Sequence, residues 1–141
     1  MWNYVTRECP ELAWTPDLSV GNSVLDQHHQ KLFLLLDEII KVEENAAGFD
    51  AMANIISELN SYISYHFTEE EGMMAKANFP FLDLHRHSHQ TIAQRVLEIA
   101  GLLTPDNYRR IAAELHTFMT GWLVHHIEIE DFEYRPYICT P

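Results

Sequence analysis

One amphipathic stripe between Met52 and Met73 carries polar residues at positions where a helix normally buries apolar ones. Its members alternate spacings of four and three, which is the period of one face of an α-helix. The stripe consists of Met52, Ile56, Leu59, Ile63, His66, Glu70 and Met73. An unpaired carboxylate at a core position costs on the order of several kcal/mol, so Glu70 needs a positive partner. For this pair alone, a hydrogen bond from His66 is a simpler explanation than a metal ion.

Three further stripes with the same period predict three more helices, and each of them also contains histidine at a core position. The first stripe is Leu25, His29, Leu32, Leu36 and Ile39. The third is His85, His89, Ile92, Val96, Ile99 and Leu103. The fourth is Ile111, Leu115, Met119, Trp122, His126 and Ile129. The sequence therefore predicts an all-α protein with four amphipathic helices.

Cap residues and helix breakers set the expected boundaries of these helices. Asn22 or Ser23 is expected to cap the first helix, and Asp50 the second, which should end near residue 77. Thr104, followed by Pro105 at the first helical position, is expected to begin the fourth. The short connections favour an antiparallel up-down-up-down four-helix bundle over residues 22–135. Residues 1–21 should form an ordered N-terminal arm, and residues 136–141 a C-terminal tail.

Composition restricts the class of protein further. A chain of 141 residues with 47% hydrophobic residues is long enough for one domain with a continuous core. A formal net charge of −12 argues against nucleic acid or an anionic membrane as a partner. Cys9 and Cys139 are the two cysteines, which indicates neither a disulfide framework nor a thiolate metal site. Because no signal peptide or membrane-spanning run is recognisable, we expect a cytoplasmic location.

Antiparallel packing brings the core histidines to one end of the predicted bundle. The starts of the first and third helices then lie beside the ends of the second and fourth. This places His29, His66, His85, His89 and His126 together with Glu70. Tolerated core histidines would scatter along a bundle, so the shared end favours a metal site over a metal-free structural bundle. The remaining histidines, which lack this pattern, are expected at the surface or behind the ligands: His28, His87, His116 and His125.

The types of donor narrow the choice of metal. Nitrogen and oxygen ligands without thiolate suit iron, manganese, zinc or copper, and more ligands than one ion can use indicate a carboxylate-bridged pair. Carboxylate-rich four-helix sites use Glu-x-x-His motifs, and no such motif occurs in this chain. A ferritin-like oxidase site is therefore disfavoured, and the expected site is rich in histidine.

Five segments of the chain resemble the hemerythrin family, and in particular its single-domain bacterial members. They occur in the family's order and are WTPDLSVG from Trp14, LDQHHQKL from Leu25, HFTEEEGMM from His66, HRHSH from His85, and WLVHHIEIED from Trp122. The resemblance implies a non-haem di-iron centre with an oxo or hydroxo bridge between the two iron ions. Position 28 departs from the family, whose members usually have Gln where this chain has His28.

The resemblance also implies which residues hold each iron ion. His85, His89 and His126 would bind one iron, and His29 and His66 the other, which keeps an open position for dioxygen. Glu70 and Asp131 would bridge the pair. An apolar wall that keeps water and protons from this position is expected from Ile63, Met119, Trp122 and Leu123. For Ile63 and Met119, a plain core role explains the sequence equally well.

Asp131 is the one expected ligand that helix geometry does not favour. At about 100° per residue, position 131 lies roughly 140° around an ideal helix from His126, whereas Glu130 points nearly the same way. The family pattern selects Asp131. If Asp131 is a ligand, the backbone after His126 should widen into a π-type turn, or the helix should end there.

Several functions are consistent with such a centre. The leading interpretation is reversible dioxygen binding for carriage, storage or delivery, with no enzymatic activity and with the receiving protein unknown. The first alternative is a sensor of oxygen or redox state that acts through a partner. The second is a di-iron peroxidase or nitric-oxide-handling enzyme, which needs a proton donor beside the open position, and no donor stands out in the sequence.

Overall fold

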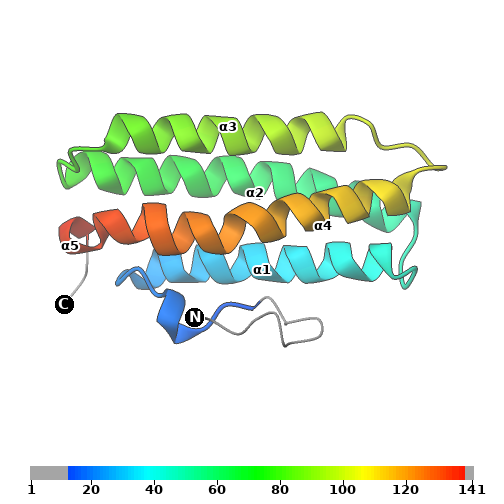
Figure 1. The fold of residues 1–141 in the computed structure, drawn as a ribbon, viewed down its shortest axis with the longest axis horizontal. Coiled ribbons are helices and arrows are strands. Elements are labelled where there is room, and N and C mark those ends of the chain that lie inside the picture. Colours follow the sequence, from blue (N-terminus) through cyan, green and yellow to red (C-terminus); the bar gives the residue numbers. More distant parts are fainter. Residues whose placement is uncertain (1–12, 139–141) are drawn as a thin grey trace.

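Four long helices lie side by side in the computed structural model of the chain, which describes residues 13–138 (Figure 1). They are α1 (Ser23–Glu43), α2 (Phe49–Lys76), α3 (Leu82–Ala100) and α4 (Tyr108–His125). Consecutive helices run in opposite directions, and no strand occurs between residues 13 and 138. The predicted all-α antiparallel four-helix bundle is confirmed. None of the helices in this part of the chain is long and apolar enough to cross a membrane.

Short elements flank the bundle at the end where the predicted ligands gather. A 3₁₀ turn, η2 (Pro16–Leu18), precedes α1. A π-helical turn, η3 (His126–Asp131), continues α4 and is followed by η4 (Phe132–Tyr134) and α5 (Arg135–Ile138). The long helices pack in a ring, α1 against α2 and α4, and α3 against the same two. Each helix therefore turns one apolar stripe toward a common core.

The residues that cap α1 and α2 agree with the prediction for α1 and differ from it for α2. The Asn22 side chain accepts hydrogen bonds from the backbone N–H groups of Val24 and Leu25 at 3.0 and 3.1 Å, as expected for the cap of α1. The predicted cap of α2 is wrong, because Gly48 holds that position and Asp50 lies inside the first turn. Asn78 follows α2 with φ 56°, a left-handed conformation that ends the helix in the expected region.

The predicted start of the fourth helix is also wrong, because α4 begins at Tyr108. The backbone N–H of Thr104 donates to Asn107 Oδ1 at 2.6 Å, and the Asn107 N–H donates back to Thr104 Oγ1 at 3.2 Å. Asn107 Nδ2 also donates to the carbonyl of Leu102 at 2.7 Å. These side-chain bonds stabilise a turn in place of the first helical turn.

The described part of the N-terminal segment packs onto the bundle. Leu18 and Val20 are buried in the core, and Asp26 of α1 accepts hydrogen bonds from Ser19 Oγ at 2.6 Å and from the Val20 N–H at 2.9 Å. The rest of the predicted arm, residues 1–12, and residues 139–141 of the predicted tail lie outside the described residues. The division of the chain at residues 22 and 135 stays a prediction.

Candidate metal centre

Three of the long helices, α1, α2 and α3, and the turn η3 that continues α4 contribute to one buried cluster of histidines and carboxylates. None of its side chains exposes more than 4% of its surface. The cluster contains all seven residues predicted as ligands: His29 from α1, His66 and Glu70 from α2, His85 and His89 from α3, and His126 and Asp131 from η3. The two buried carboxylates require a positively charged partner, which is either a metal ion or a protonated histidine.

The Nε2 atoms of the five histidines converge on the two carboxylates. Asp131 Oδ1 lies 2.9 Å from His85 Nε2 and 3.2 Å from His126 Nε2, while its Oδ2 lies 3.1 Å from His29 Nε2. Each oxygen of Asp131 therefore faces a different set of imidazoles. We call His85, His89 and His126 the three-histidine group, and His29 and His66 the two-histidine group.

Glu70 divides its two oxygens between the same groups. Its Oε1 lies 2.9 Å from His89 Nε2 and 3.4 Å from His85 Nε2. Its Oε2 lies 3.5 Å from His29 Nε2 and 3.6 Å from His66 Nε2. The potential donors accordingly form two sets that share Glu70, each compact enough for one ion. A carboxylate with one oxygen toward each set is placed to bridge two metal ions.

The polar atoms at the middle of the cluster fit a bound metal. Among the described residues, no hydrogen-bond partner is found for the five Nε2 atoms, for either carboxylate oxygen of Asp131 or for Oε1 of Glu70. Native proteins rarely leave buried polar atoms unsatisfied. Metal ions at the centre would satisfy these atoms together, because imidazole nitrogen and carboxylate oxygen are both good ligands for iron.

Although these atoms lack hydrogen-bond geometry, they lie close enough for ion pairs between imidazolium and carboxylate, which balance the charges of the cluster when metal is absent. Burial alone lowers the pKa of His29, but the neighbouring carboxylates of Asp131 and Glu70 raise that pKa to about 9. The same opposing effects raise the pKa of His85 to about 10. Burial disfavours a charged Glu70, yet the surrounding imidazoles, His66 foremost, keep its pKa well below the usual value. Burial also lowers the pKa of His66 to about 3.

The Nδ1 atoms of the predicted ligands have different partners in the two groups. In the three-histidine group, His89 Nδ1 lies 2.7 Å from Glu71 Oε2, and His126 Nδ1 makes a short hydrogen bond to Glu130 Oε1. In the two-histidine group, His66 Nδ1 lies 3.0 Å from His28 Nδ1, and His29 Nδ1 has no partner among the described residues. Partners of this kind fix the orientation of a ligating imidazole.

The turn η3 explains how Asp131 reaches the cluster. The expected π-helical turn between His126 and Asp131 is present, and it brings Asp131 onto the face of His126. Glu130 lies outside the cluster, where it accepts hydrogen bonds from His126 and, at 2.7 Å, from Ser88 Oγ. The π turn thus exchanges the positions that an ideal α-helix would give to Glu130 and Asp131.

Sequence reasoning missed Tyr134 and Phe67, which both contact the cluster. The buried Tyr134 hydroxyl donates a hydrogen bond to Glu70 Oε2 at 2.6 Å, and burial raises the pKa of this phenol. Its position three residues after Asp131, about one turn further on, could have identified it. Phe67 stacks on His89 with ring centroids 3.8 Å apart and an interplanar angle of 3°. Only its position beside His66 in sequence could have drawn attention to Phe67.

The four residues expected to form an apolar wall are all buried. The pocket beside the cluster includes Ile63 and not Met119, Trp122 or Leu123. The Trp122 ring lies 5.9 Å from the His126 ring, so it does contact the three-histidine group. The role of these four residues around an oxygen site stays a prediction.

The four histidines outside the predicted ligand set occupy several environments. His87 and His125 are exposed, and His116 Nδ1 lies 2.6 Å from Glu43 Oε1 at the opposite end of α1 from His29. His28 is 6% exposed and contacts His66 as described above, so it lies behind a predicted ligand.

Comparison with known proteins identifies the family. Residues 20–138 match the family described as "Hemerythrin HHE cation binding domain". A protein named bacteriohemerythrin from Stenotrophomonas maltophilia is 32% identical over 123 residues, which cover 87% of this chain and 78% of that protein. A hemerythrin-like protein from Naegleria gruberi is 32% identical over 122 residues, which cover 86% of this chain and 89% of that protein. A bacteriohemerythrin from Clostridium acetobutylicum is 27% identical over 125 residues, which cover 86% of this chain and 97% of that protein.

The chain therefore belongs to the hemerythrin family. This family binds a pair of iron ions, and its members are mainly oxygen binders that are not enzymes. The buried cluster of five histidines and two carboxylates suits such a pair, and it assigns the protein a metal-binding function related to oxygen.

Proposed function

We propose that this protein binds dioxygen reversibly at a non-haem di-iron centre, as an oxygen carrier or store. The three-histidine group holds one iron, and the two-histidine group holds the other. Glu70 and Asp131 would bridge the pair. The observation that carries this assignment is the division of each carboxylate, with one oxygen toward each histidine group.

The difference in ligand number supports a binding function. If Glu70 and Asp131 were shared by both groups, the three-histidine group would offer one more donor than the two-histidine group, and the second iron would keep a position for dioxygen. When bound, the iron pair supplies the electrons that hold dioxygen and recovers them on release. The chain supplies fixed donors, because His66, His89 and His126 are each held through Nδ1.

The surroundings of the cluster favour reversibility by keeping water out. The cluster side chains are buried, and the rings of Phe67 and Trp122 lie against His126 at centroid distances of 5.9 Å each. If water and protons reached the site, oxygen could leave in a protonated, reduced form, and binding would no longer be reversible. The low cysteine content suits a reducing compartment, and we place this activity in the cytoplasm.

Anaerobic reduction followed by air tests the proposal. Protein reconstituted with iron is reduced, exposed to air and then returned to nitrogen, while visible absorbance is followed and iron is counted per chain. We expect about two iron ions per chain, nearly colourless reduced protein, and a band that appears in air and disappears under nitrogen. Immediate and irreversible oxidation, or saturation at one iron per chain, would contradict the proposal.

A second function, a di-iron peroxidase, is favoured by Tyr134. Its phenol is buried 2.6 Å from Glu70 Oε2, so a hydroxyl donor does stand at the centre, in contrast to the expectation from sequence. Repeated turnover of hydrogen peroxide by the native protein, lost in Tyr134→Phe with both iron ions retained, would establish this function. Equal and negligible turnover in both proteins would exclude it.

A further inference from the structure

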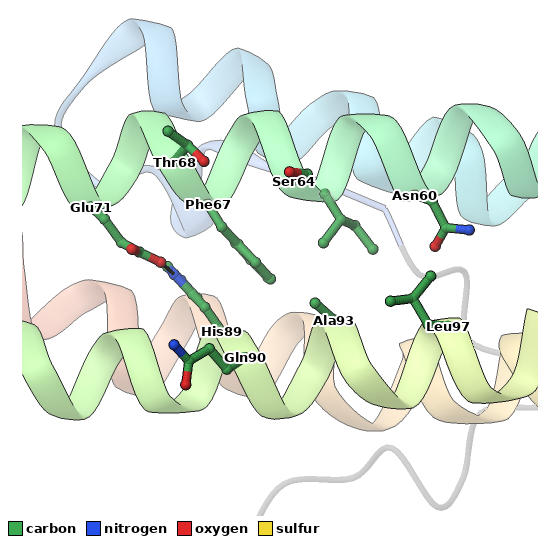
Figure 2. A pocket seen from close by; sticks show the side chains of 10 residues that line it. Asn60, Ser64, Phe67, Thr68, Glu71, His89, Gln90, Ala93 and Leu97 are labelled. Atoms are coloured by element: carbon green, nitrogen blue, oxygen red, sulfur yellow. Dashed lines mark hydrogen bonds and ion pairs between the residues drawn. The ribbon is translucent and has the colours of Figure 1, made fainter.

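A groove between α2 and α3 leads from the surface toward the metal centre (Figure 2). Its cavity volume is about 280 Å³, and it is lined by Asn60, Ile63, Ser64, Phe67, Thr68, Glu71, His89, Gln90, Ala93 and Leu97. The side chains at the outer rim are polar and exposed, as at Ser64, Thr68 and Gln90. The inner residues Ile63 and Phe67 are buried.

The groove exists because small side chains line it where the two helices meet. Ser64 lines it from α2 and Ala93 from α3, and neither can fill the space between the helix backbones. Figure 2 shows the larger Phe67 side chain extending from α2 toward α3, beside the contact of Glu71 with His89. Packed helices usually leave little empty space between them, so an apolar groove beside the proposed metal centre needs an explanation.

At the inner end of the groove, His89 itself lines the wall, and the ring of Phe67 lies close to both histidine groups. Phe67 stacks on His89, and its ring centroid lies 5.7 Å from that of His66 and 5.9 Å from that of His126. Ile63 lies one turn before His66 on the buried stripe of α2. A molecule that passes between Ile63 and Phe67 therefore reaches His89 of the three-histidine group and His66 of the two-histidine group.

We propose that this groove is the passage by which dioxygen enters and leaves the centre, with Phe67 as its movable barrier. The inference rests on the proposed function. The apolar inner walls favour an apolar diatomic molecule over water, and the volume greatly exceeds what one such molecule requires. Phe67 is retained by packing alone, and such contacts open by side-chain motion without unfolding.

A second surface pocket reaches the cluster and suits dioxygen less well. Its volume is about 180 Å³, and it is lined by Phe81, Leu84, His85, Glu130 and Glu133. Its two carboxylates, from Glu130 and Glu133, favour water over an apolar molecule. The groove between α2 and α3 has a single carboxylate, Glu71, which is already bonded to His89.

Filling the groove tests the passage. Ala93→Leu and Ser64→Leu add bulk from opposite walls, and Ala113→Leu is the matched control, because Ala113 is a half-buried alanine lining an open pocket near the start of α4. Oxygen association and dissociation are measured by stopped flow and flash photolysis. Entry and exit cross the same barrier, so we expect both rate constants to fall by about ten-fold in the two groove variants, with the dissociation constant unchanged.

Xenon gives a readout that does not depend on oxygen chemistry. Crystals of the iron-loaded protein under xenon pressure should hold xenon between Ser64 and Ala93, and Ala93→Leu should remove it. Rates in both groove variants equal to those of Ala113→Leu would overturn the passage. So would a change in affinity without a change in association rate, or xenon reaching the centre through another cavity. Failure of the passage is distinguishable from failure of the proposed function, because native protein could still show a reversible oxygen band if dioxygen entered by another route.

Discussion

At the scale of single residues, the two histidine groups differ most in what stands behind the imidazoles. Carboxylates of Glu71 and Glu130 accept from Nδ1 of His89 and His126 in the three-histidine group. The two-histidine group has the imidazole of His28 in that role and, among the described residues, no partner for His29 Nδ1. A carboxylate makes a ligating imidazole more basic, so an iron ion held by the three-histidine group, as proposed, should be the more easily oxidised of the pair.

Glu71→Gln tests this asymmetry. The substitution keeps a hydrogen-bond acceptor behind His89 but removes the negative charge, so the ferric state loses stabilisation. We expect the midpoint potential to rise by on the order of tens of mV. Glu69→Gln removes the same charge from an exposed position of α2 without a bond to a ligand, and serves as the control. Equal potentials in the two variants would show that the bond to His89 does not tune the iron.

The neighbouring positions 130 and 131 should respond very differently to truncation. Asp131→Ala removes a proposed bridge between the two histidine groups, and we expect loss of at least one iron per chain and of the oxygen band. Glu130→Ala removes the hydrogen-bond partner of His126 and Ser88 but no proposed ligand, and we expect weaker iron binding, by roughly 10- to 100-fold, with the band retained at saturating iron. The reverse ranking of the two variants would show that Glu130 is the ligand.

At the scale of secondary-structure elements, sequence periodicity predicted the four helices and the end of the bundle where the histidines meet. The histidines replace apolar residues on stripes that are otherwise regular, so periodicity alone was enough to place them in the core. The start of α4 was not predictable from Pro105, because the turn depends on hydrogen bonds between Thr104 and Asn107 that compete with the helix. Phe67 escaped notice because an apolar residue beside a core stripe looks like ordinary core.

The π turn η3 provides a test at this scale. Deletion of Ile129, which is 55% exposed, places Asp131 four residues after His126 and returns η3 to α-helical register. We expect this variant to retain two iron ions per chain, because the carboxylate stays on the face of His126. Deletion of the exposed Gly121 instead rotates His126 itself away from the cluster and should abolish iron binding. Loss of iron in both deletions would show that the widened backbone itself is required.

At the scale of the whole molecule, metal binding and folding are linked because the cluster joins α1, α2 and α3 to the turn η3 that continues α4. Without metal, its buried charges are balanced by protons on histidine, and those protons must leave before the imidazoles can bind metal. The pKa values of about 9 for His29 and about 10 for His85 mean that both imidazoles are protonated near neutral pH in the metal-free protein. Iron binding should therefore release protons and become tighter as pH rises.

The stability of the metal-free protein should change with pH in the opposite direction. The pKa of His29 rises from 6.5 in the unfolded chain to about 9 on folding, and that of His85 from 6.5 to about 10. The stabilisation from these raised pKa values is complete below pH 6.5 and disappears as pH passes through the folded values. Between pH 6.5 and 9, the folded state thus binds more protons than the unfolded state, and the free energy of unfolding should decrease.

Thermal unfolding at several pH values, with and without iron, measures this linkage. We expect the Tm of the metal-free protein to fall steadily from pH 6.5 to 9. The Tm of the iron-loaded protein should lie higher, and the gap should widen with pH, because iron replaces the protons that the metal-free centre loses. His29→Gln removes one of the two titrating imidazoles and should flatten the metal-free curve, whereas His87→Gln, at an exposed position, should leave it unchanged. A metal-free Tm that rises over this range would contradict the ion pairs assigned to His29 and His85.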